Sequence, residues 1–252
     1  MNTQEATFKY ALRLGDNALI LGHRLSELCS KGPILEEDLA LTNISLDMIG
    51  RTQALLKYAA ELEMLNKTED DLAYRRSENH YYNFLMMEQP NGDFAHTIAR
   101  QLYISVYEFL FYTELEKSKD ATLAAIASKT IKEIKYHMQH AVDWTLRLGD
   151  GTAESHKRMQ KALNDLWMYT SEFFEMDHLD TFLLHQHIAV DATTLKAEWQ
   201  KYISTALTES TLMTPEDSYM QTGSKKGIHT ENLGHILFEM QYLQRAYPDA
   251  KW

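Results

Sequence analysis

The sequence predicts an all-helical protein in which four long helices form a bundle and further helices follow toward the C-terminus. Only 4 prolines and 10 glycines occur among the 252 residues, which is too few for an all-β protein with many tight turns. Apolar residues recur at helical spacing through most of the chain. No shift in composition marks a border, so we expect one domain over residues 1–252.

Segments with helical spacing alternate with short polar connections, and this alternation gives the order of the elements. Four of the segments are long and consecutive, which favours a four-helix bundle with the later helices packed outside it. The predicted helices cover residues 7–29, 35–65, 93–118, 121–148, 155–174, 192–208 and 230–247.

The first two helices have clear end signals. Leucines form the apolar stripe of the first, and Lys31-Gly32-Pro33 stops it. The second opens with Glu36, Glu37 and Asp38, where acidic side chains stabilise the positive end of the helix dipole. Residues 66–71 are then expected to form a loop.

Turns delimit the later helices. Gln89-Pro90-Asn91-Gly92 precedes the third, and Gly149-Asp150-Gly151-Thr152 closes the fourth. Residues 175–192 are expected to be irregular, with room for one short helical piece. A polar stretch at residues 214–227 leads to the last helix.

The composition limits the partners and the compartment. The chain has 25 basic and 36 acidic residues, a net charge of −11, which argues against nucleic acid as a partner. Cys29 is the single cysteine, so no internal disulfide can form, as expected in a reducing cytoplasm. No signal peptide and no membrane-spanning run is recognised. We expect a cytoplasmic protein that binds neither nucleic acid nor membrane.

A long four-helix bundle raises the question of a metal site in its interior. A ferritin-like di-iron centre takes a Glu from each of two helices and Glu-x-x-His from each of the other two. We recognise no Glu-x-x-His in the chain. The nearest pattern places Glu133 four residues before His137, and the first two helices offer Asp16 and Asp47. We expect no metal site and regard these four residues as remnants of one.

A buried hydrogen-bonded cluster is the alternative explanation for polar residues on helix faces, because buried polar groups must be satisfied somehow. Asn43, four residues before Asp47, and Ser105 and Glu108 in the third helix belong to the same set. A single weak metal site stays open. There is no nucleophile elbow and no phosphate-binding glycine loop, so no catalytic residue is predicted.

One basic spot interrupts the acidic sequence. Lys225 and Lys226 follow Gly223, and His229 and Glu231 lie at the start of the last helix. Lysines beside a helix N-terminus can hold an anion such as a CoA phosphate, and they can equally contact acidic residues of a partner. A solvated loop is the third alternative.

Six segments of the chain carry a family resemblance: LRLGDN at 12–17, DLALTNISLD at 38–47, EQPNGDFAHTIARQ at 88–101, ASKTIKEIKYH at 127–137, KKGIHTENLG at 225–234 and EMQYLQR at 239–245. They resemble the structural C subunits of bacterial phenylacetyl-CoA epoxidases, and the similarity extends from about residue 8 to residue 252. Ser105 departs from the acid expected there in some relatives, which moves the chain further from metal binding.

This resemblance implies a ferritin-like fold without a working di-iron centre. It implies pairing with a homologous catalytic A subunit that carries the iron, in a heterotetramer. That complex would epoxidise phenylacetyl-CoA with O₂ and electrons from a reductase component. The isolated chain is expected to form a homodimer through the surface meant for its partner.

Three hypotheses follow. The first is a non-catalytic structural subunit. The second is a stand-alone di-iron or di-manganese oxygenase with Asp16, Asp47, Glu133 and His137 as ligands. The third is iron storage, which needs the same ligands and ranks last.

Overall fold

The computed structural model describes residues 2–63, 66–248 and 250. Contacts divide the chain into two compact units. Unit 1 consists of residues 1–90 and 223–252, and unit 2 consists of residues 91–222. The expectation of a single domain over residues 1–252 stays a prediction.

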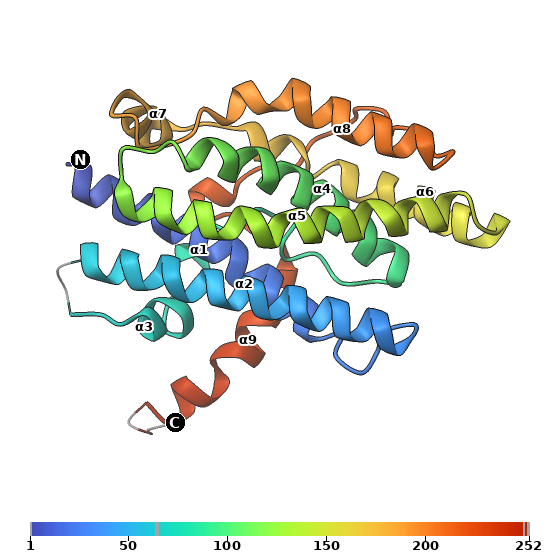
Figure 1. Ribbon diagram of the computed structural model, residues 1–252. Coiled ribbons are helices and arrows are strands. Elements are labelled where there is room, and N and C mark those ends of the chain that lie inside the picture. The colour runs from blue at the N-terminus through green and yellow to red at the C-terminus, as the bar shows by residue number, and fades with distance from the viewer. Residues whose placement is uncertain (1, 64–65, 249, 251–252) are drawn as a thin grey trace. The chain divides into compact units, whose positions relative to one another are not determined.

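Unit 1 is built on an antiparallel pair of long helices, α1 (Thr3–Ser26) and α2 (Leu35–Leu62), drawn in blue and cyan in Figure 1. The two helices approach closely where α1 carries glycine. A Cβ added at Gly15 would lie 2.6 Å from the Leu56 side chain. Helix α1 is therefore buried along most of its length, including the polar side chain of Asp16.

The segment after α2 differs from its prediction. Helix α2 ends at Leu62, so the predicted end at residue 65 is too late, and residues 64 and 65 themselves lie outside the described part of the chain. The predicted loop at 66–71 contains the start of a short helix, α3 (Glu69–Tyr74). Thr68 and Asp71 form a reciprocal capping box there, which fixes the start of a helix too short to show periodicity.

The C-terminal helix α9 (Glu231–Ala246) belongs to unit 1, where it packs on α1, on α3 and on the 3₁₀ turn η1 (Glu78–His80). A second 3₁₀ turn, η4 (Ser224–Lys226), leads into it. Gly227 follows with φ 69° in the left-handed region, and a Cβ there would lie 2.2 Å from the Asn79 carbonyl oxygen. Glycine is thus required where this turn meets the backbone near η1.

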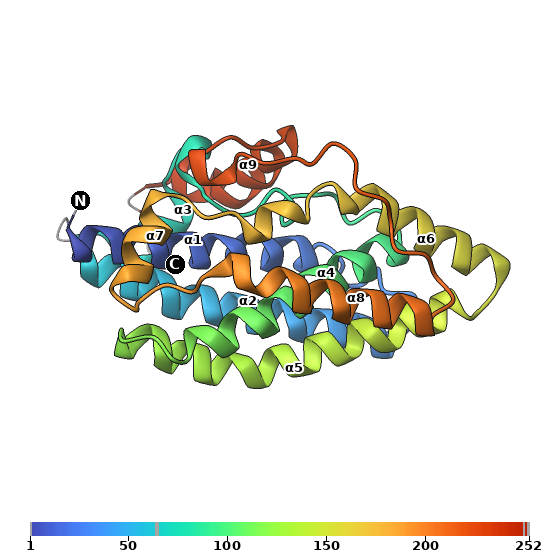
Figure 2. The ribbon, with the colours of Figure 1, turned by 90° about the horizontal axis from the view of Figure 1, so that it is seen from above.

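Unit 2 is built on the antiparallel helices α4 (Phe94–Leu115) and α5 (Ala121–Gly149), coloured green in Figures 1 and 2. Asp93 and Asp120 cap them by accepting hydrogen bonds from the backbone N–H groups of His96 and Leu123. The remaining elements are α6 (Ala153–Trp167), η2 (Ser171–Phe174), α7 (His178–His185), η3 (Ala192–Leu195) and α8 (Lys196–Glu209).

Aromatic side chains form the centre of unit 2. Trp199 on α8 is 1 % exposed and packs against Tyr103 and Trp167, with ring centroids 5.8 and 5.7 Å away. The Trp199 indole N–H donates to the Tyr103 carbonyl oxygen at 3.0 Å, so its polar atom is satisfied within the core.

Three predicted boundaries in unit 2 are wrong by three residues or more. The helix expected at 93–118 ends at Leu115. The helix expected at 155–174 ends at Trp167, and η2 occupies the last four predicted positions. The helix expected at 192–208 begins as η3. The short helical piece expected within 175–192 is confirmed as α7.

The predicted fold class, all-helical and ferritin-like, is confirmed. Over the described ranges the chain forms helices and no strand, and the four long helices form one antiparallel pair in each unit. None of the described helices combines the length and the apolar character needed to cross a membrane.

Candidate functional site

Asp16, one of the four predicted remnant residues, is fully buried, and its carboxylate forms an ion pair with an arginine. Asp16 is 0 % exposed. The Arg76 guanidinium donates to both carboxylate oxygens, from one nitrogen to Oδ1 and from Nη1 to Oδ2 at 3.0 Å. The backbone N–H of Tyr82 donates to Oδ2 at 2.9 Å. Asp16 therefore forms a bidentate ion pair in the core of unit 1.

Asp16 and Arg76 each shift the pKa of the other. Burial raises the pKa of the Asp16 carboxyl, and the charge and hydrogen bonds of Arg76 oppose that rise. Burial lowers the pKa of Arg76, but the Asp16 carboxylate outweighs it and raises the pKa overall. Arg76 also stacks over the Tyr81 ring, 4.1 Å from its centroid. Each charge is thus compensated only by the other and by its immediate neighbours.

This arrangement does not fit an iron ligand. A metal ion would need the carboxylate oxygens that the guanidinium and the Tyr82 N–H occupy. A metal ion that took the Asp16 carboxylate would leave the Arg76 guanidinium buried without its counter-ion, at a cost of about 3–5 kcal/mol. Asp16 therefore has the geometry of a structural ion pair.

A second buried cluster lies in the same unit, around Glu88. This side chain is 0 % exposed and accepts hydrogen bonds from Asn83 Nδ2 at 3.0 Å and the Thr230 backbone N–H at 2.6 Å. His229 Nδ1 lies 3.0 Å from Glu88 Oε2, and His229 Nε2 lies 2.8 Å from the Tyr81 carbonyl oxygen. The cluster fixes the start of α9 against the chain at residues 81–88.

Both ring nitrogens of His229 face acceptors, so a doubly protonated ring satisfies both contacts. Burial lowers the pKa of His229, but hydrogen bonding to Glu88 and to Tyr81, together with the negative charge of Glu88, raises it overall. The side chain of His229 is only 1 % exposed. A contact of this ring with CoA or with a partner would require breaking both hydrogen bonds, and that predicted contact stays untested.

The other remnant residues differ in burial. Asp47 and Glu133 are half-buried, on α2 and α5, whereas His137 on α5 is 0 % exposed. Asn43 is exposed, so the expectation of a polar pair with Asp47 on an apolar helix face is wrong: α2 turns position 43 to solvent. Ser105 and Glu108 are both buried on α4.

No cluster of three or more His, Cys, Asp or Glu side chains suited to a metal ion occurs in the part of the chain that the structure describes. The expectation that the chain contains no Glu-x-x-His is wrong: one such sequence exists, outside the long helices, at Glu175 to His178. Glu175 has extended backbone angles and follows η2, while His178 is the first residue of α7. Its two ends therefore do not share a helix face, as metal binding by this motif requires.

The remaining predicted contact residues lie near the start of α9. Lys225 is half-buried, whereas Lys226 and Glu231 are exposed. Lys225 and Lys226 belong to η4, and Thr230 is the N-cap residue of α9. The basic spot is thus held at a helix start, as the sequence predicted.

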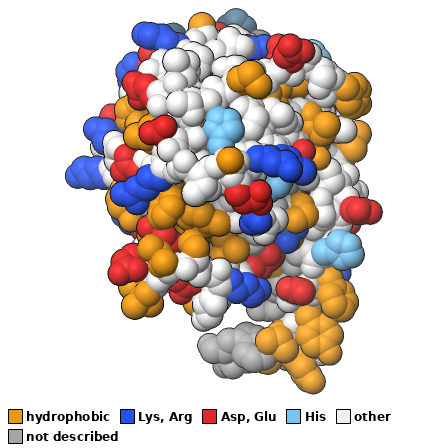
Figure 3. All heavy atoms as spheres, turned by 90° about the vertical axis from the view of Figure 1, so that its right-hand side faces the viewer, with side chains coloured by type: hydrophobic (Ala, Val, Ile, Leu, Met, Phe, Trp, Pro, Cys, Tyr) orange, Lys and Arg blue, Asp and Glu red, His pale blue; other side chains and the backbone are white. Residues whose placement is uncertain are grey.

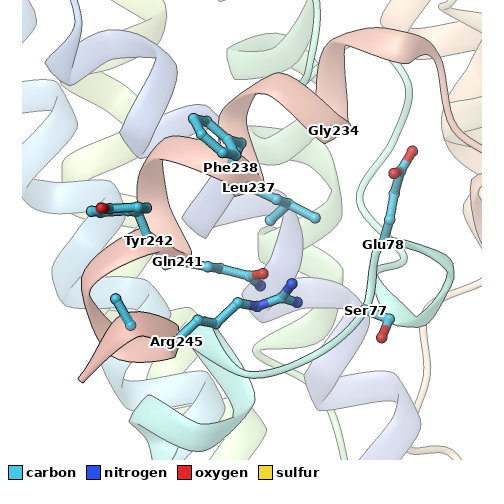
Figure 4. A pocket seen from close by; sticks show the side chains of 9 residues that line it. Ser77, Glu78, Gly234, Leu237, Phe238, Gln241, Tyr242 and Arg245 are labelled. Carbon is cyan, nitrogen blue, oxygen red and sulfur yellow. The ribbon is translucent and has the colours of Figure 1, made fainter. Parts of the chain in front are cut away.

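A groove of about 650 Å³ runs beside α9 (Figure 4). Phe238 and Tyr242 lie along α9 in this view, and Ser77 and Glu78 lie across the groove, at the start of η1. Phe238 is 72 % exposed and Tyr242 is 58 % exposed. Figure 3 shows that exposed hydrophobic side chains also lie among charged ones on the face it draws.

Comparison with known proteins decides the family. A family model described as phenylacetic acid catabolic protein matches residues 1–252. The chain belongs to this family. It is similar to the C subunit of the 1,2-phenylacetyl-CoA epoxidase of Escherichia coli (strain K12), with 48 % identity over 243 residues, 96 % of this chain and 98 % of the relative. The resemblance stated from the sequence segments is confirmed.

Sequence reasoning missed the residues that satisfy the two buried carboxylates of this chain. Arg76 and Glu88 lie in the mixed polar region between the second and third long helices, where no pattern distinguished them. Arg76 is 60 residues from Asp16 in the chain, and Glu88 is 141 residues from His229. The one available signal was the need of a buried Asp16 for a cationic partner.

Proposed function

We propose that the chain is the non-catalytic structural subunit of a phenylacetyl-CoA epoxidase in aerobic phenylacetate degradation. The observation that carries the proposal is the 48 % identity, over nearly the full length of both chains, to the C subunit of an epoxidase of that name. A subunit name implies other subunits as partners. The finer parts of the proposal are a homologous catalytic A subunit as the direct partner, a heterotetramer and a cytoplasmic location.

We also infer that this chain carries no cofactor and that the di-iron centre belongs to the A subunit. The bidentate ion pair of Asp16 with Arg76 supports this inference, because a carboxylate needed for iron is committed to a guanidinium. The role of the chain is then to stabilise and shape its catalytic partner through a helical interface.

Co-purification tests the assembly. The chain is co-expressed with the A subunit of an epoxidase from this family, and an affinity tag on the A subunit alone is used for capture. We expect both chains to elute together at the mass of a heterotetramer. Failure to co-elute at micromolar concentrations would end the proposal.

An omission assay tests the role in the reaction. Epoxidation of phenylacetyl-CoA is measured with the A subunit and the other oxygenase components, with and without this chain. We expect turnover to depend on the chain. A chain that supports turnover without any A subunit would instead favour the stand-alone oxygenase.

The basic spot has two proposed ligands, and one substitution separates them. Lys226→Glu reverses an exposed charge beside the start of α9. Binding of CoA and binding of the A subunit are both measured. Lys132→Glu, at an exposed position of α5, is the matched control. A loss in one of the two measurements assigns the contact, and no loss in either indicates a solvated loop.

A further inference from the structure

The groove between α9 and the start of η1 has an aromatic wall that is open to solvent. Phe238 and Tyr242, one turn apart on α9, are both exposed, and the buried Leu237 lines the same groove. Aromatic side chains gathered beside a hollow of about 650 Å³ are more than the scattered apolar residues found on most surfaces. We call this hollow the α9 groove, and Figure 4 shows the side chains that line it.

Gln241 supplies a hydrogen-bond acceptor to the α9 groove. The residue is only 2 % exposed, and its Nε2 donates to the Arg76 carbonyl oxygen at 2.9 Å and to the Tyr81 hydroxyl at 2.7 Å. Because a carbonyl oxygen can only accept, these contacts fix the orientation of the amide. Over the described ranges no group donates to the remaining atom, Oε1. An occupant of the groove that carries an N–H or O–H group can do so.

Among the described residues, Glu78 and Arg245 are the charged ones that line the α9 groove, and they lie toward opposite ends of α9. A Cβ added at Gly234 would lie 3.4 Å from Glu78 Oε2, so this carboxylate lies beside the start of the helix. Arg245 belongs to the last turn, eleven residues after Gly234, which corresponds to about 16.5 Å along the axis. The groove is therefore negative beside the start of α9 and positive toward its end.

We propose that the α9 groove binds an amphipathic helix of another component of the epoxidase, antiparallel to α9. Such a helix places its first turn beside Arg245 and its last turn beside Glu78. Acidic residues in the first turn and basic residues in the last turn also suit the dipole of the bound helix itself, so one orientation satisfies both the groove and its occupant. The apolar side of the helix then packs on Phe238 and Tyr242.

The shape of the α9 groove favours a different chain over a second copy. Two copies that met groove to groove would each present a hollow surface, and the space between them would stay unfilled, unlike the close packing of protein interiors. A single helix with its side chains is about 10–12 Å across and offers the convex surface that a groove needs. This inference rests on the proposed function, because it takes the occupant from the proposed complex.

Hydrogen–deuterium exchange locates the contact. The chain is mixed with the purified A subunit in one arm and with the remaining epoxidase components in a second arm, and the exchange of each peptide is followed by mass spectrometry. The chain alone, at the same concentration, is the reference. We expect the amides of residues 234–246 to exchange about tenfold more slowly, or slower still, in the arm that contains the occupant.

Two substitutions test the aromatic wall and the charge. Phe238→Asp and Arg245→Glu are each expected to raise the dissociation constant of the protecting component about tenfold or more, because each removes a central contact of the groove. Tyr219→Asp is the matched control: its side chain is 75 % exposed, as Phe238 is 72 % exposed, but it belongs to unit 2, and we expect unchanged binding. Circular dichroism verifies that the variants are folded.

Three results would overturn the inference. The first is a chain that binds the A subunit while residues 234–246 exchange at the reference rate in both arms; the proposed function would then stand without it. The second is full affinity of Phe238→Asp and Arg245→Glu for every component. The third is protection of residues 234–246 that grows with the concentration of the chain alone, because the occupant would then be a second copy. A chain that binds no component at all would end the proposed function as well.

Discussion

At the scale of single residues, two buried carboxylates of unit 1 are each paired with a basic side chain. Asp16 is matched by Arg76, and Glu88 is matched by His229. A buried ion pair contributes little net stability, but removing one member leaves an uncompensated charge in the core. This asymmetry makes the pairs sensitive to substitution on one side.

Arg76→Ala is expected to lower the free energy of unfolding by about 3–5 kcal/mol, because it leaves the Asp16 carboxylate buried without a cation. Arg75→Ala is the matched control. Its side chain is 51 % exposed and its ion pair with Asp71 lies at the surface, so we expect a loss below about 1 kcal/mol. Urea unfolding followed by circular dichroism measures both. Equal losses in the two variants would contradict the account.

The Glu88–His229 pair predicts a dependence of stability on pH. The folded pKa of His229 is raised above its unfolded value of 6.5. Its contribution is therefore fully present below about pH 6.5 and is lost as pH rises through the folded pKa. Urea midpoints are expected to fall with rising pH over that interval, and His229→Gln should remove this component. A midpoint that rises with pH and is unaffected by the substitution would refute it.

At the scale of helices, substitution of two helical glycines by alanine is expected to change stability in opposite directions. A Cβ at Gly50 meets no atom within 4 Å, so Gly50→Ala is expected to stabilise α2 by about 0.5–1 kcal/mol. A Cβ at Gly149 would lie 2.2 Å from the Ser210 backbone oxygen, so Gly149→Ala is expected to destabilise the end of α5. Thermal unfolding at low protein concentration measures both, and the same sign for both would contradict the structure.

The helices show which parts of the fold could be predicted from sequence. All four long helices were predicted, because periodicity is a local property repeated over many turns. The bounds of α5 were predicted to within one residue, whereas α1, α2 and α4 each end three residues before the predicted end. The six-residue α3 was missed because it contains less than two turns, and its evidence is the capping pair of Thr68 with Asp71. The end of α6 at Trp167 was misplaced because helical residues continue in η2.

The candidate site was predictable only in part. The sequence singled out Asp16 and His229 as polar residues that required an explanation. It did not give their partners, Arg76 and Glu88, because contacts between distant residues leave no periodic pattern. The prediction that Asp16 is a remnant rather than a ligand came from the missing Glu-x-x-His motifs, whereas the contacts of its carboxylate with Arg76 and Tyr82 are described only by the structure.

At the scale of the whole molecule, our proposal gives assembly to this chain and iron chemistry to a partner subunit. The family supports a role in phenylacetate catabolism. The Asp16–Arg76 pair gives a physical reason why a helical chain of this fold would leave the metal to a homologous subunit.

Anaerobic titration of the isolated chain with Fe(II), followed by calorimetry, tests this division of labour. We predict no stoichiometric binding, because the carboxylate of Asp16 stays bound to Arg76. Binding of two iron ions per chain, lost in Asp16→Asn, would contradict it.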